Sequence, residues 1–227
     1  RESLEKLVLR GEPEAIVAVV HATQVSNEIA RRAWWCSPTS DNARCLLRSQ
    51  EVVNGSMGSE LANFLVEFLP FEESSRAMMS SVYLVLQAEL ISAATRADIW
   101  KRAKRRNAFY LGFIRQGSHS LPAEKPNHPD FEFCQQLLTR QDDPYLEILY
   151  TMFSSSGQTM LEIMGIVLRK PNDQDVAVEI FNSIGDTFST ELTLPRNWRN
   201  IDELKEYVEK TIPVSYTHLR AHETSNH

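Results

Sequence analysis

The densest group of chemically active side chains is a basic run near the middle of the chain. Trp100 precedes this run and Phe109–Tyr110 follows it. A basic helix flanked by aromatic side chains could bind nucleic acid or another anionic surface. The competing interpretation is the solvated face of a helix, which is the common fate of a block of like charges. The candidate residues are Lys101, Arg102, Lys104, Arg105 and Arg106.

The three cysteines, Cys36, Cys45 and Cys134, are the other candidates for chemistry. Cys36 and Cys45 flank a turn between two expected helices and could approach each other, which is one hypothesis for this pair. The competing hypothesis is that they are free thiols in a reducing cytoplasm. None of the cysteines forms a C-x-x-C pair or has a histidine at ligand spacing, so the sequence predicts no metal site.

Patterns typical of enzymes are missing from the sequence. The adjacent carboxylates Glu72–Glu73 and Asp142–Asp143 stand at expected helix starts, where they interact favourably with the helix dipole. Neighbouring residues of a helix do not converge on one substrate. There is no G-x-S-x-G motif, and no glycine-rich phosphate loop follows a strand. We therefore expect no catalytic residue, no cofactor and no enzymatic activity.

Composition and charge narrow the class of protein further. Of the 227 residues, 42% are hydrophobic and 9% aromatic, which is ample for a folded core. A net charge of −6 suits a cytoplasmic protein and argues against sequence-independent DNA binding, which needs a basic footprint. No apolar run approaches the roughly 20 residues of a membrane-spanning helix, so no membrane span is expected.

Helices must position these side chains, because apolar residues recur at helical spacing and period-two alternation never extends beyond a few residues. Short helices with brief turns predict an all-α fold of stacked antiparallel helices, either a bundle or a loosely solenoid-like stack. The expected helices cover residues 4–10, 13–22, 27–36, 40–53, 56–69, 72–86, 92–115, 131–140, 144–153, 158–168, 175–188 and 201–211.

Two apolar stripes in the N-terminal half predict a shared core. One ends in Trp34, and the other contains Leu61, Phe64, Leu65 and Phe68. If both stripes face the interior, the phenylalanines are buried against the tryptophan. The alternative is that the phenylalanine stripe is exposed and recognises a partner.

Composition also predicts the domain organisation. Residues 117–129 are rich in Pro, Gly and Ser and are expected to link two helical segments, 1–116 and 130–213. The first residue already lies inside an amphipathic pattern, so we expect the natural N-terminus to lie upstream. Residues 214–227 lack periodicity and resemble a translated sequencing adapter, so we expect a disordered non-native tail. Three of the six histidines, His218, His222 and His227, fall within it.

Several stretches of the chain resemble the sulfur reduction protein DsrS family. These are soluble proteins encoded alongside dissimilatory sulfite reductase genes, mainly in sulfur-oxidising bacteria. The resemblance covers most of residues 1–116 and, less distinctly, 130–213; it implies a role in dissimilatory sulfur metabolism and transfers no catalytic residue. The stretches are GEPEAIVAVVHA (11–22), EIARRAWW (28–35), NAR (42–44), GSMGSELANFLVEFLPFEE (55–73), SVYLVLQAELI (81–91) and DIWKRAKRRNAFYLGF (98–113).

Three functional hypotheses follow. The first is a cytoplasmic accessory or regulatory protein of dissimilatory sulfur metabolism that binds a protein partner. The second is a nucleic-acid-binding regulator that uses the basic residues at 101–106. The third is a sulfur-handling protein with a reactive Cys36 or Cys45. Steep salt dependence of RNA or DNA binding would favour the second, and a depressed thiol pKa would favour the third.

Overall fold

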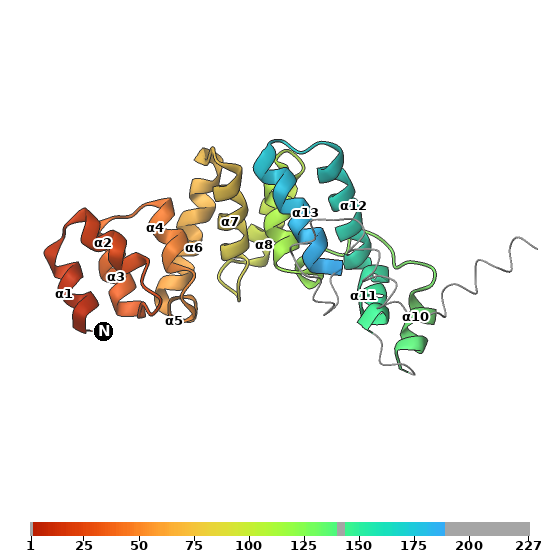
Figure 1. Ribbon diagram of the computed structural model, residues 1–227, viewed down its shortest axis with the longest axis horizontal. Helices are drawn as coiled ribbons and strands as arrows, with labels where there is room; N and C mark the ends of the chain where they lie inside the picture. Colours follow the sequence, from red (N-terminus) through yellow and green to blue (C-terminus); the bar gives the residue numbers. More distant parts are fainter. Residues whose placement is uncertain (1, 140–143, 189–227) are drawn as a thin grey trace, which may run out of the picture. The chain divides into compact units, whose positions relative to one another are not determined.

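A computed structural model describes residues 2–139 and 144–188, and throughout these residues the regular structure is helical (Figure 1). This confirms the predicted all-α class. None of the described helices combines the length and apolar character needed to cross a bilayer. The expected helix at 201–211, the tail at 214–227 and its three histidines lie outside the described residues.

The helices are short and follow one another closely along the chain. The first seven are α1 Glu2–Arg10, α2 Pro13–Val20, α3 Asn27–Cys36, α4 Ser40–Leu46, α5 Gln50–Val53, α6 Ser56–Phe68 and α7 Ser75–Val85. The others are α8 Ala93–Ala103, α9 Asn107–Arg115, α10 Phe131–Leu138, α11 Pro144–Phe153, α12 Ser155–Arg169 and α13 Gln174–Phe188. Two 3-10 turns, η1 Leu69–Phe71 and η2 Ser118–Ser120, complete the set.

Serine side chains cap the N-termini of several of these helices. The Ser26 hydroxyl accepts a hydrogen bond from the Ile29 amide at 3.3 Å, and Ser74, Ser92 and Ser154 cap α7, α8 and α12 in the same way. Each cap satisfies an amide that the first helical turn leaves without a partner. These local signals explain why most helices begin within a few residues of their expected start.

The expected helices at 40–53 and 92–115 were wrong in one respect, because each is divided in two. The first breaks between α4 and α5, where the Ser49 hydroxyl donates to the Val25 carbonyl at 2.9 Å. The second breaks between α8 and α9, and the turn lets Trp100 pack edge-on against Phe113, with ring centroids 5.0 Å apart. Neither break contains a glycine or proline, so apolar periodicity alone predicts one continuous helix in each case.

The central packing of the described chain joins α7 and α9. Gly112 on α9 lies so close to α7 that a Cβ there would stand 2.5 Å from the Cβ of Val82. Phe113 and Leu111 beside it are fully buried. Helix α13 packs against both α7 and α9, and α12 also contacts α9. Residues before and after 117–129 therefore contribute to one hydrophobic core.

The stretch at 117–129 is held to the helices around it. The Trp100 indole donates to Glu124 Oε1 at 2.7 Å, and Leu121 is buried. Further along, the His128 amide donates to the Phe153 carbonyl at 2.8 Å, and its ring stacks on Phe153 with centroids 4.2 Å apart. The stretch connects the two expected segments and contributes Leu121 to their common core.

The predicted contact between Trp34 and the stripe on α6 is confirmed in part. Trp34 is buried and meets Phe64 edge-on, with centroids 4.8 Å apart. The buried face of α6 runs through Leu61 and Leu65, whereas Phe64 is only partly buried. Phe68 lies outside the core cluster, so its assignment to the core was wrong.

Candidate functional site

The basic run straddles the end of α8 and the turn that follows, and all five of its cations are exposed. Cations at the C-terminus of a helix interact favourably with the helix dipole, which gives part of the run a structural role. Arg102 pairs with Asp98 at 2.6 Å, and Arg106 donates to the Glu72 carbonyl oxygen at 3.1 Å. Lys101, Lys104 and Arg105 form no ion pair with a described residue.

The surroundings of this turn carry both signs of charge. The Asn107 side chain donates to the Lys170 carbonyl at 2.8 Å and so places the α12–α13 connection beside the turn. That connection also bears Asp173, which accepts from the Ser75 hydroxyl, and Asp175 in the first turn of α13 pairs with Arg76 at 2.9 Å. The cations therefore do not form the uninterrupted positive stripe that is typical of a nucleic-acid interface.

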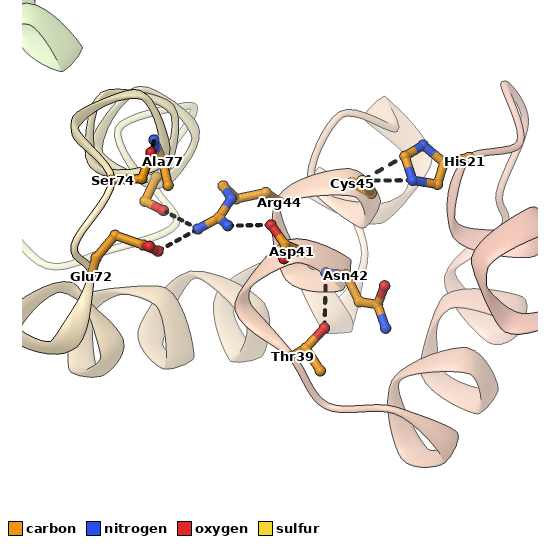
Figure 2. A network of polar contacts seen from close by, with 10 residues as sticks. His21, Thr39, Asp41, Asn42, Arg44, Cys45, Glu72, Ser74 and Ala77 are labelled. Atoms are coloured by element: carbon orange, nitrogen blue, oxygen red, sulfur yellow. Dashed lines mark hydrogen bonds and ion pairs between the residues drawn. The ribbon is translucent and has the colours of Figure 1, made fainter. Parts of the chain in front are cut away.

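The cysteines lie in three different environments. Cys36 is exposed at the end of α3, Cys134 is buried on α10, and all three thiols are free. Cys45 on α4 is half-buried, with its Sγ 3.7 Å from Nε2 of His21 (Figure 2). Among the described residues, no group of three or more His, Cys, Asp or Glu side chains is arranged to hold a metal ion.

Burial raises the pKa of the Cys45 thiol above its ordinary value. The charge of Asp41 acts in the same direction, and the charges of Arg48 and Arg44 oppose it. Because the thiolate is the nucleophile, a raised pKa makes Cys45 less reactive at neutral pH. The depressed pKa that the sulfur-handling hypothesis requires is therefore absent at this thiol.

A buried arginine, which sequence reasoning missed, joins α4 to α7. Arg44 is only 8% exposed, and its Nη1 lies 2.7 Å from Glu72 Oε2 and 3.2 Å from the Ser81 hydroxyl. Its Nη2 pairs with Asp41, three residues earlier on the same helix (Figure 2). The only sequence signal was this Asp41–Arg44 spacing. Since carboxylates already occupy the guanidinium, the group ties helices together and is not free to bind an anion.

A row of aromatic rings leads from the core to the surface. It starts at buried Trp34, passes through partly buried Phe64 and Phe68 on α6, and ends at Phe71 on η1, which is 73% exposed. Successive ring centroids are 4.8, 5.9 and 6.2 Å apart. We call Phe64, Phe68 and Phe71 the aromatic row. Exposed carboxylates of Glu60 and Glu67 lie on the same helix.

The chain was compared with known protein families, with curated proteins and with solved structures, and no match was found.

Proposed function

We propose that this chain is a non-catalytic accessory protein that binds a protein partner through the aromatic row. The observation that carries the proposal is the graded exposure of the row, from Trp34 in the core to Phe71 at the surface. Aromatic residues are enriched at protein interfaces, where they supply large contact areas at low entropic cost. Packing on Trp34 holds the inner ring in place, so a partner would meet a preorganised surface.

The charges near the row indicate the chemistry of the partner. Glu60 and Glu67 are exposed, and they lie about one turn before and one turn after Phe64 on α6. Complementary charge improves specificity and speeds association. The partner surface that fits combines apolar side chains at its centre with lysine or arginine at its rim.

The resemblance to the DsrS family suggests where such a partner would be found. The aromatic row lies within the stretch 55–73, which is one of the stretches that carry the resemblance. We infer a cytoplasmic role in dissimilatory sulfur metabolism, with dissimilatory sulfite reductase as the first partner to test. The nucleic-acid hypothesis has less support because the basic turn carries mixed charge, and the sulfur-handling hypothesis loses support at Cys45, whose thiol has a raised pKa.

The test is a binding titration of the purified chain with purified dissimilatory sulfite reductase, followed by biolayer interferometry. Phe71→Ala should weaken binding at least tenfold, about the 1.4 kcal/mol expected when an interface aromatic is truncated. Phe181→Ala removes a similarly exposed ring from α13, since Phe181 is 66% exposed, and should leave the affinity unchanged. Equal losses for both variants, or no binding by the unaltered chain, would contradict the proposal.

A further inference from the structure

A concave site lies where the α4–α5 connection, the end of α7 and the residue after α9 meet. It is a depression open to solvent, with a volume of about 430 Å³. Val53 and Leu84 supply its apolar lining. The site is separate from the aromatic row, and no residue of the basic run lines it.

The described lining residues include one guanidinium and three side-chain amides. Arg48 is exposed, and it forms no ion pair or side-chain hydrogen bond with any residue of the described chain. The amide groups of Gln50 and Gln87 are likewise without a hydrogen bond to a described residue. Gln116 donates through Nε2 to the Tyr83 carbonyl at 2.7 Å, which fixes the side chain and leaves its Oε1 as an acceptor.

Tyr83 and Ala88 form the remaining wall of the site. Arg115 lies over the Tyr83 ring, 4.7 Å from the centroid, and its charge is matched by Glu179 at 3.2 Å. Ala88 on the rim has φ of +44°, a left-handed conformation that is uncommon for a residue with a Cβ. Such local strain tends to occur at sites that bind ligands.

These groups select among ligand classes. A guanidinium presents donors in a fork that matches one carboxylate. Each glutamine amide offers both a donor and an acceptor, which is the pattern that a peptide group also displays. A phosphate group is usually met by several cations or by a cluster of backbone amides, and among the described lining residues Arg48 is the only one with a charged side chain. One face of Tyr83 is already covered, which leaves less room to stack a base.

We propose that this site binds a short acidic peptide segment, with the glutamate or aspartate carboxylate on Arg48 and the peptide groups on Gln50, Gln87 and Gln116. The apolar floor contacts the aliphatic part of the segment. Binding in this mode needs no change in the fold, because the lining residues belong to helices and turns that the core already fixes. Free glutamate carries the same carboxylate but lacks the flanking peptide groups.

The test is an NMR titration of the full chain with acetyl-Ala-Glu-Ala-amide, acetyl-Ala-Gln-Ala-amide and free L-glutamate. The acidic peptide should bind at least tenfold more tightly than either other probe and should shift the side-chain amide signals of Gln50, Gln87 and Gln116. Arg48→Gln should remove the preference for the acidic peptide. Lys101→Gln, which removes the same charge from another exposed position, should preserve it.

Other outcomes would overturn the assignment. Equal binding of the two peptides, absence of binding, or an unchanged preference in Arg48→Gln would refute the acidic-peptide site. Equal binding of free glutamate would refute the assignment to a peptide. The backbone spectrum of Arg48→Gln reports in the same experiment whether the variant is folded. Phe71→Ala should bind the acidic peptide normally, so a failure here is distinct from a failure of the aromatic row.

Discussion

Burying the Arg44 guanidinium costs hydration free energy, and its hydrogen-bonded partners offset that loss. Taking a guanidinium and a carboxylate out of water is expensive, and the attraction between them repays it only with good geometry and further hydrogen bonds. Arg44 meets these conditions through Glu72, Ser81 and Asp41. Removing one partner should therefore cost far more than the small contribution expected of a surface ion pair.

Glu72→Ala should lower the free energy of unfolding by about 3 kcal/mol, at the low end of the range for a broken buried pair, because Asp41 still faces Arg44. The neighbouring Glu73 is exposed, so Glu73→Ala should change stability by less than about 0.5 kcal/mol. Urea denaturation of the two variants and the unaltered chain measures both values. Similar small changes in both variants would show that the Arg44–Glu72 pair contributes little to stability.

Residues whose partners are close in the sequence were predictable, and residues with distant partners were not. Ser26 could be assigned as a cap because its partner is three residues away. Arg44 finds Glu72 and Ser81 at separations of 28 and 37 residues, which no local pattern encodes. The lining of the acidic-peptide site is assembled in the same way from Arg48, Tyr83 and Gln116. Such groupings exist only once the helices have packed.

At the scale of elements, the contact between α7 and α9 depends on the absence of a side chain at Gly112. The Val82 Cβ and the Met79 carbonyl oxygen would lie 2.5 and 3.1 Å from a Cβ at this position. Glycine in a helix costs roughly 0.5–1 kcal/mol relative to alanine. Here that cost is offset because the two helices can approach closely and bury Phe113 and Leu111.

Gly112→Ala should destabilise the chain by about 1–3 kcal/mol, because the added methyl group overpacks the α7–α9 contact. Gly165→Ala is the matched control, since a Cβ at that position of α12 meets nothing within 4 Å. It should stabilise the chain by about 0.5–1 kcal/mol through helix propensity. Thermal melts followed by circular dichroism compare them, and an equal effect of the two changes would refute the close contact.

Helix existence could be predicted from the sequence far better than helix breaks. Apolar periodicity continues from α8 into α9, and no proline or glycine lies in the turn between them. The break is favoured by tertiary contacts, namely the edge-on packing of Trp100 against Tyr110 and Phe113. The same limit applies to Phe68, whose spacing suits the core although α6 buries its Leu61–Leu65 face.

At the scale of the whole molecule, the helices after residue 129 complete the core that the earlier helices begin. Ile180 on α13 is 1% exposed, and α13 packs on both α7 and α9. Val176, Met160 and Ile163 belong to the same core cluster as Val82. Composition alone suggested a linker at 117–129, because it reports proline and glycine content but not the contacts made across the stretch.

Ile180→Ala should lower the free energy of unfolding by about 2–5 kcal/mol, the range for truncating a buried aliphatic side chain. Its neighbour Phe181 is 66% exposed, so Phe181→Ala should change stability by less than about 0.5 kcal/mol. Circular dichroism and Trp100 fluorescence, the latter in a chain whose other tryptophans are replaced by phenylalanine, should report one shifted transition. A shift in circular dichroism without one in Trp100 fluorescence would indicate separate cores.

The pairing of α13 with α7 and α9 has a consequence for synthesis on the ribosome. Most early helices contact neighbours in the sequence and can pack as soon as they emerge. The apolar faces of α7 and α9 that receive α13 must wait until the chain from Arg115 to Phe188 has been made, roughly 4–15 s at bacterial and eukaryotic elongation rates. During that interval the nascent chain exposes apolar surface that is prone to aggregation. We expect a holding chaperone to bind the chain at this stage.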